Sequence, residues 1–321
     1  MSQAKGSRAQ LLGGVAEANF GSTPGSISAI LLPIISSNIR QNRNLIETNV
    51  IRSRRDAAAP TKGVYDVSGD VVVPVDVNNI GYWLWMILGN ASSDQSVAPY
   101  HHIFQVQSDL PSFVMEQGYV DISEYLKYNG CMGNSIAFAF DAGADAELTA
   151  TVNIMGQVEA APASASIDAS PSEHSLKRFE ITDLALEEGG SPIANVAVCN
   201  ITISNNLDGS QYVVGGAGKR GDILEGLCQV SGNIEALFEN ETLYNKARNS
   251  TESSLKATLT SGSYSLELLI NELVFSEESP GIPGPQGIRV NLPFRAYYDD
   301  KSPDVTIIQA ILYNEVSAFT T

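Results

Sequence analysis

Residues 135–156, SIAFAFDAGADAELTATVNIMG, decide the fold of this chain. Apolar residues occupy every second position from Ile136 to Phe140 and again from Leu148 to Ile154, with small or polar residues between them. Such alternation places the apolar side chains on one face of a strand. The acids and the glycine between the two stretches are typical of a turn. The segment therefore predicts two half-buried antiparallel strands joined as a hairpin.

The same period of two recurs along the chain and predicts a mainly β fold of the sandwich or barrel type. The later alternating stretches begin at Ile201, Leu255, Leu266 and Val290.

One helix interrupts the strands, at residues 80–88. Its apolar residues recur at intervals of three and four, Asn78 or Asn79 can cap its start, and Gly89 ends it. Its remaining side is apolar too, so a single sheet cannot cover it. The cover comes either from a second layer of the same domain or from a neighbouring subunit.

The chain divides into two halves that resemble each other. Residues 38–45 match residues 200–207 at an offset of 162, and residues 67–71 match residues 230–234 at an offset of 163. A strand and a short helical segment follow in each half, the second helix from Leu243 onward. Two matches in one order predict a tandem duplication. We expect a flexible arm at 1–20, a first domain at 21–157, a linker at 158–177 and a second domain at 178–321.

Composition limits the classes of function. The chain of 321 residues is 43% hydrophobic, only 17% charged, and carries a net charge of −17. Residues 1–62 hold eight basic and three acidic residues, a net +5, which leaves −22 for the rest. So negative a surface disfavours adhesive binding of nucleic acid, because that affinity comes largely from Lys and Arg. No leader peptide or membrane span is expected, since no apolar run is long enough.

Catalytic and cofactor chemistry is not indicated. His101 and His102 start a strand, where alternation sends their rings to opposite faces and prevents shared chelation. The glycine-rich residues 214–220 lack the spacing and the Ser or Thr of a phosphate loop. The cysteines are widely spaced, and we expect them to be free thiols: Cys131, Cys199 and Cys228. We therefore expect no enzyme activity, no metal and no cofactor.

Residues 40–62 are the one basic region of an acidic chain, and we expect a long mobile loop there. A merely solvated loop is one reading. The sharper reading is docking onto an acidic face of a neighbouring subunit, and contact with nucleic acid is a third. The candidate contact residues are Arg40, Arg43, Arg52, Arg54 and Arg55.

In their serial order, several short motifs resemble phage tail tube proteins. The resemblance covers residues 20–156 well and 178–316 more loosely. It rests on Thr23-Pro24-Gly25, Leu32-Pro33, Ser68-Gly69-Asp70-Val71, Leu88-Gly89, residues 100–104, Pro111-Ser112-Phe113, Tyr128-Asn129-Gly130-Cys131 and Asn153-Ile154-Met155-Gly156.

This resemblance implies subunits that close into six-fold rings around a continuous inner β-barrel, and rings that stack through a long loop, which we place at 40–62. It implies a virion protein made in the host cytoplasm, which contacts other tail proteins. DNA would pass through a negative lumen without specific binding. With two tube domains per chain, a trimeric pseudo-hexamer is preferred; a true hexamer is the alternative if the second half decorates the outside. Other readings are a baseplate or terminal ring protein and a carbohydrate-binding module.

Overall fold

The structure is a computed structural model, and it describes residues 3–90, 92–94, 96–143, 146–193, 195–238, 241–282, 284–298 and 306–319. It confirms the prediction of a mainly β chain: the strands join in one large antiparallel sheet that folds into two layers, and the described residues include two short α-helices. The expected hairpin is present, with Phe138 opposite Ala150, while residues 144 and 145 of its tip lie outside the described residues.

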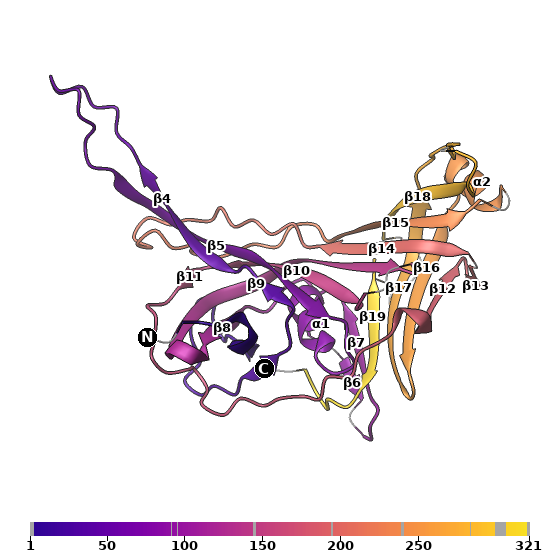
Figure 1. The fold of residues 1–321 in the computed structure, drawn as a ribbon, viewed down its shortest axis with the longest axis horizontal. Helices are drawn as coiled ribbons and strands as arrows, with labels where there is room; N and C mark the ends of the chain where they lie inside the picture. Colours follow the sequence, from indigo (N-terminus) through magenta and orange to yellow (C-terminus); the bar gives the residue numbers. More distant parts are fainter. Residues whose placement is uncertain are drawn as a thin grey trace.

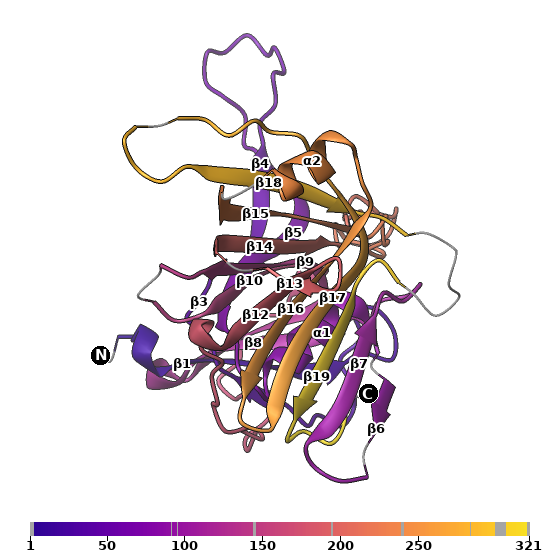
Figure 2. The same ribbon diagram turned by 90° about the vertical axis from the view of Figure 1, so that its right-hand side faces the viewer.

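A long, continuous layer runs through both halves of the chain (Figure 2). Its neighbouring strands in order are β3 (Ser36–Ser37) and β4 (Arg40–Ile46), β5 (Thr61–Pro74), β10 (Thr149–Gly156), β9 (Glu124–Asp141), β14 (Val196–Ser204), β15 (Gln229–Leu237) and β18 (Arg289–Ala296). One face of this layer is apolar and buried, and the other is polar.

The first half closes its core with a second layer, in which β1 (Ala9–Ala16) lies between β2 (Ile30–Leu32) and β8 (Phe113–Tyr119). Two 3-10 turns, η1 (Gly6–Arg8) and η2 (Val120–Ile122), precede β1 and β9. The early part of β9 pairs with β8 and with β11 (Val158–Glu159), and its later part crosses into the long layer.

The expectation of a flexible arm over residues 1–20 is therefore wrong for the residues of β1. Leu11 and Leu12 are fully buried, and Leu11 lies opposite both Leu32 and Gln117. The small residues around these leucines do not show the alternation of a strand, although β1 has a partner strand on each side.

Helix α1 (Ile80–Leu88) has the predicted bounds, and all of its residues are buried. Neither expected asparagine caps it with its side chain. Instead, Asp76 accepts hydrogen bonds from the backbone N–H groups of Asn78 and Asn79. Phe113 packs edge-on against Trp85, and Phe319 packs edge-on against Tyr82. The cover thus comes from the same chain and not from a neighbouring subunit, with Phe113 in the first half and Phe319 in the second.

The second half is built around β16 (Ser253–Ser261) and β17 (Tyr264–Phe275). Beside β16 lie β12 (Leu184–Glu188) and β13 (Ser191–Pro192), and beside β17 lie β19 (Gln309–Asn314), β7 (Tyr100–Gln105) and β6 (Ser92–Asp94). The 3-10 turn η3 (Ile181–Asp183) precedes β12, and α2 (Thr242–Arg248) follows β15, as the sequence predicted for a helix near Leu243.

The connection at residues 160–177 has no strand of its own but follows the surface of the first half. Ser166 and the backbone N–H of Ile167 donate to Glu116, and Asp168 accepts from the N–H of Ala29. Of the expected linker at 158–177, the first two residues form β11, and hydrogen bonds of Glu116 and Asp168 hold part of the rest against the first half.

The two halves pair their strands in the same register. Arg40 of β4 lies opposite Ser68 of β5, and Thr202 of β14 lies opposite Ser231 of β15, which reproduces the offsets of 162 and 163. A glycine follows each serine and lies close to the backbone of the neighbouring strand. A Cβ at Gly69 would come within 2.5 Å of Ile39 Cα, and one at Gly232 would overlap the carbonyl oxygen of Asn200.

We expect Gly232→Ala to lower the free energy of unfolding by about 1–3 kcal/mol, because β14 must move to admit the methyl group. Urea denaturation measures this change. Gly25→Ala is the control, since a Cβ there meets nothing within 4 Å, and its effect should stay within about 0.5 kcal/mol. Equal unfolding midpoints for the two variants would contradict the close approach.

Candidate assembly surfaces

The junction between the halves is a pairing of two strands. Seven residues of β9 lie opposite seven of β14, from Ser135 opposite Ser204 to Asp141 opposite Val198. On the apolar face, Phe138 and Ile201 form one buried pair of this junction. The backbone ladder therefore continues from the first half into the second without an edge.

A second connection is the crossing loop, which we define as residues 205–228 between β14 and β15. It runs back over the first half beside β5 (Figure 1). The N–H of Tyr65 donates to the carbonyl of Gly218, and the Tyr212 hydroxyl donates to the carbonyl of Tyr65, both at 2.8 Å.

Arg220 holds the crossing loop in place. Its side chain is only 4% exposed, and it donates to the carbonyls of Gly209, Val67 and Gly156 at 2.6, 3.1 and 2.5 Å. It also forms an ion pair with Asp66. A guanidinium suits this site because its planar fork can serve several acceptors at once.

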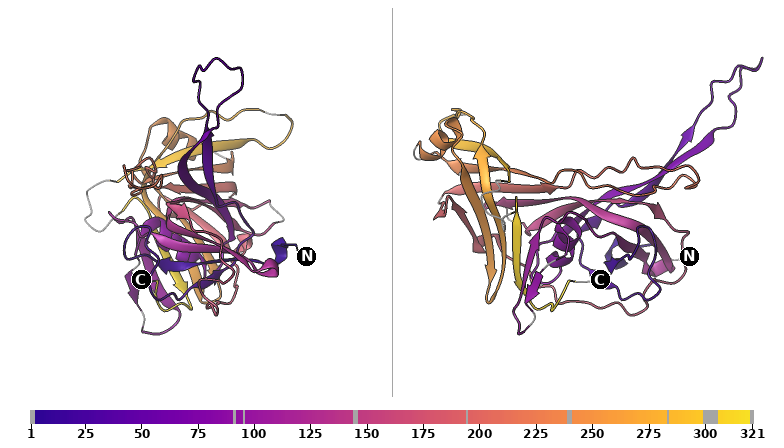
Figure 3. Two further views of the ribbon diagram at one scale, coloured as in Figure 1. Left: turned by 90° about the vertical axis from the view of Figure 1, so that its left-hand side faces the viewer. Right: turned by 180° about the vertical axis from the view of Figure 1, so that it is seen from behind.

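The most exposed surface is the ribbon, which we define as β4, residues 47–60 and the first part of β5, residues 61–66. It extends well away from the body (Figures 1 and 3). The expected loop of 40–62 is therefore shorter: Arg40–Ile46 is a strand paired with β5, and only residues 47–60 are irregular.

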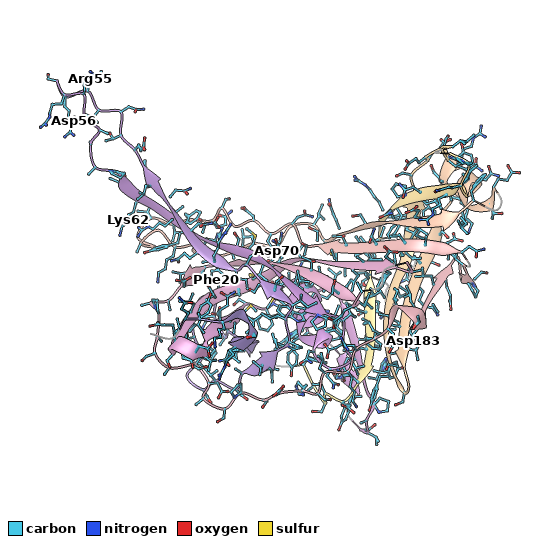
Figure 4. The ribbon with its side chains drawn as sticks, viewed as in Figure 1. Phe20, Arg55, Asp56, Lys62, Asp70 and Asp183 are labelled. Atoms are coloured by element: carbon cyan, nitrogen blue, oxygen red, sulfur yellow. The ribbon has the colours of Figure 1, made fainter. Side chains whose placement is uncertain are left out.

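The five candidate arginines fall into two groups on the ribbon. Arg40 and Arg43 lie on β4, where Arg43 donates to the carbonyl of Gly63 and stacks its guanidinium 4.2 Å from the centre of the Tyr65 ring. The three others, Arg52, Arg54 and Arg55, lie on the exposed loop, and Figure 4 places Arg55 at its far end.

Contacts within the loop are few and local. Arg52 donates to the carbonyl of Ala57, and Arg54 pairs with Asp56 with both side chains about 70% exposed. Apolar side chains are exposed beside them, with Ile51 at 97% and Val50 at 67%. The ribbon therefore presents both charged and apolar side chains to solvent.

The polar face of the long layer carries a row of amide side chains. In the first half, Asn153 donates to Asp70 at 2.6 Å, and Asn134 donates to Asn153 at 3.0 Å. The Asp70 N–H in turn donates to the side-chain oxygen of Asn38. These hydrogen bonds run across the strands and fix their side chains.

A similar row crosses the second half. Asn200 donates to Asn233 at 3.0 Å, Asn233 to Asn291 at 3.2 Å, and Asn291 to Glu278 at 2.8 Å. The row ends at Glu278, which is exposed beside β18.

Charged residues on the strands of the polar face are of both signs. The acids are Asp66, Asp70, Asp141 and Glu235, and the bases are Arg40, Lys62, Arg289 and Arg295. The net −22 of residues 63–321 is therefore not concentrated on these strands.

The neighbouring histidines His101 and His102 pack against other side chains of the fold. His102 is fully buried and bonded through its ring nitrogens to Ser93, Asn314 and the carbonyl of Val316, and burial lowers its pKa. His101 faces the other way and stacks on Tyr313, as the alternation predicted.

The three cysteines are free, as expected, and burial raises the pKa of Cys199 to about 12 and that of Cys228 to about 11. The described residues contain no cluster of His, Cys, Asp and Glu that could hold a metal. No helix among them has the length and apolar character needed to cross a membrane.

Sequence reasoning missed the crossing loop and Arg220. Residues 214–220, which lack the features of a phosphate loop, form a turn in which the Lys219 N–H donates to the carbonyl of Gly216. The sequence offered one signal of a special role for Arg220: it is an arginine at the end of a glycine-rich segment in an acidic half of the chain. Only the position of Asp66 and of the β5 carbonyls gives it a role.

An antiparallel layer that runs through both halves and a projecting ribbon define a β-rich protein with an extended exposed surface. The chain belongs to the phage tail tube protein family, whose model matches residues 6–296. The match spans nearly the whole chain and includes both halves. No curated protein sequence matches this chain.

We expect Arg220→Met to lower the free energy of unfolding by about 1–3 kcal/mol, because buried carbonyls and Asp66 lose their donor. Urea denaturation of the purified chain measures the change. Arg178→Met is the matched control: Arg178 is 57% exposed and pairs with Glu147 at 3.0 Å, so its loss should cost no more than about 1 kcal/mol. An effect of Arg220→Met no larger than that of the control would exclude the role assigned to Arg220.

Proposed function

We propose that this protein is the structural subunit of a bacteriophage tail tube, and that it assembles with itself into stacked rings that conduct the genome. The observation that carries the proposal is the long layer, which runs unbroken from β4 to β18; β4 is paired on one side only, and β17 pairs with only one end of β18. A strand with one unpaired edge is a template for pairing with another chain. Ring closure would pair every such edge.

We propose that residues 21–157 and 178–321 are two copies of one tube domain. Three features support this duplication. The strand registers repeat at the offsets of the sequence matches, α1 and α2 each follow the equivalent strand, and β9 and β17 each pass from one layer to the other. The strand β1 belongs with the first copy, since it pairs with β8 as β12 pairs with β16.

Two domains per chain make three chains sufficient for a ring of six domains. The β9–β14 pairing would then supply every second domain junction within a chain, and pairing between chains would supply the rest. We therefore propose a trimeric pseudo-hexamer. A true hexamer would require the second half to lie outside the ring, which the continuous layer disfavours.

The ribbon is the element that we propose to connect one ring with the next. It reaches beyond the body of the subunit (Figure 4). The exposed fractions of Ile51 and Val50 indicate surface that association would bury. Arg52, Arg54 and Arg55 would meet acidic residues of the neighbouring ring, since the rest of the chain is strongly acidic. Other tail proteins would cap the two ends of the tube.

We propose that the polar face of the long layer lines the lumen. Amide side chains bonded to one another offer DNA few free donors, and acids of that face repel phosphate. DNA would therefore pass without specific binding. On this assignment, the lumen is less negative than the sequence led us to expect, because acids and bases both lie on the face.

The family is a structural one of the virion, and we propose a non-enzymatic role in the phage tail after synthesis in the host cytoplasm. Electron microscopy of the purified protein tests the function: we expect rings and tubes with three-fold symmetry and six-fold pseudosymmetry. A protein that remains monomeric at every concentration and salt would contradict the proposal.

Replacing Arg52, Arg54 and Arg55 together by glutamine should shorten the tubes or reduce them to single rings. The loop contacts of these residues are local, so the free energy of unfolding should stay within about 0.5 kcal/mol of the wild-type value. Tube length by microscopy and its dependence on salt are the measurements. Arg178→Gln is a control for the loss of an exposed arginine. Tubes of unchanged length and salt resistance would show that the ribbon charges do not connect rings.

A further inference from the structure

The two ends of the long layer differ in charge. At one end, β4 pairs only with β5 among the described strands, and its segment 36–46 contains Arg40 and Arg43 but no acid. At the other end, β18 pairs with β15 along its length on one side. On its other side, residues 276–280 run beside the part of β18 that does not pair with β17. This segment contains Glu277 and Glu278 but no base.

Residues 276–280 continue the direction and the register of β17. The last pair of β17 with β18 is Phe275 opposite Phe294, and the N–H of Ser276 donates to the carbonyl of Pro293. Extension of this antiparallel register places Glu278 opposite Asn291, and the two side chains are hydrogen bonded at 2.8 Å. The segment thus has the position of an edge strand.

The β9–β14 junction shows how a neighbouring strand can pair with such an edge. There Ala137 lies opposite Thr151 of β10 on one side and opposite Thr202 of β14 on the other. The polar face contains all three residues. In this junction neither member of the pair Ala137 and Thr202 is charged.

The equivalent positions at the ends of the layer follow from the registers. Arg40 takes the place of Thr202, because each lies opposite the serine that precedes the close-packed glycine. Asn291 takes the place of Thr151, because their partners Glu235 and Val72 are separated by the same offset of 163 that separates Ser231 from Ser68. Glu278, opposite Asn291, therefore takes the place of Ala137.

We propose that a second copy of this chain seats its β4 edge along residues 276–280, with Arg40 of one copy directly opposite Glu278 of the next. The inference rests on the proposed tube function and names the pairing between chains. Both side chains are exposed, and among the described residues Arg40 has no ion-pair partner. Exposed Ile282 and Leu237 lie at the same end and leave apolar surface for a neighbour to cover.

The opposite charges of Arg40 and Glu278 contribute more to the alignment of the two strands than to the strength of association between the chains. One opposite-charge pair across two strands contributes about 0.2–1 kcal/mol, and two like charges there are destabilising. A slip by one residue would turn the side chains to the wrong face. The junction within the chain needs no such selection because the covalent connection fixes its partner. Ring symmetry repeats the pair at every chain-to-chain contact.

A charge exchange tests the proposal. Arg40→Glu and Glu278→Lys should each abolish rings and tubes in size-exclusion chromatography and microscopy, and the double variant should restore them, since each contact then again joins opposite charges. Glu124→Lys is the control, with the same change of charge as Glu278→Lys at an exposed acid that begins β9. Circular dichroism and the unfolding midpoint establish that every variant is folded.

A cysteine pair provides a second readout. The same register places Asn42 opposite Ser276, so Asn42→Cys with Ser276→Cys should give chains linked by a disulfide upon oxidation. Asn42→Cys with Pro280→Cys is displaced by four residues and should not link. If wild-type tubes form but the exchange fails to restore assembly and the first pair does not link, this pairing is overturned while the tube function stands. If the wild type forms no rings, the tube function itself fails.

Discussion

Backbone pairing between β9 and β14 is the interaction on which the rest of the structure depends. Strand N–H and C=O groups need partners, and each sheet edge leaves a row of them unpaired. The seven residue pairs of this junction remove two edges and turn two separate sheets into one. The crossing loop and Arg220 then follow from that geometry, because they lie over the surface which the junction brings within reach.

The connections after β14 and after β4 illustrate the same constraint. The crossing loop after β14 finds the first half of its own chain and is fixed there by Arg220 and Tyr212. The connection after β4, residues 47–60, is exposed along nearly its whole length and packs on no surface among the described residues. A second subunit would supply the missing surface. The exposed Ile51 is in keeping with that explanation.

The polar face of the sheet differs from its buried apolar face because its side chains form hydrogen bonds with one another. Carboxamides such as Asn153 and Asn233 accept and donate within their own rows, so they satisfy one another without net charge. The negative charge of the chain lies largely elsewhere. Because these amides bond to one another, they leave few free donors on that face.

The sequence by itself determined the local elements. The period of two predicted the hairpin around residues 141–148, and intervals of three and four predicted α1 with its bounds, because both patterns reflect neighbours within a few residues. The repeat at 162 and 163 also anticipated a register that the pairing reproduces. Free cysteines and the opposite orientations of His101 and His102 followed from spacing alone.

Tertiary structure alone decided which strands meet. It placed β1 between β2 and β8, joined β9 to β14, shortened the expected loop at residues 40–62 to 47–60, and gave Arg220 its acceptors. These features depend on contacts between residues far apart in the chain, such as Arg220 and Asp66. Alternation specifies which face of a strand is buried, but backbone hydrogen bonding is the same for every residue and so leaves no mark of the partner in the sequence.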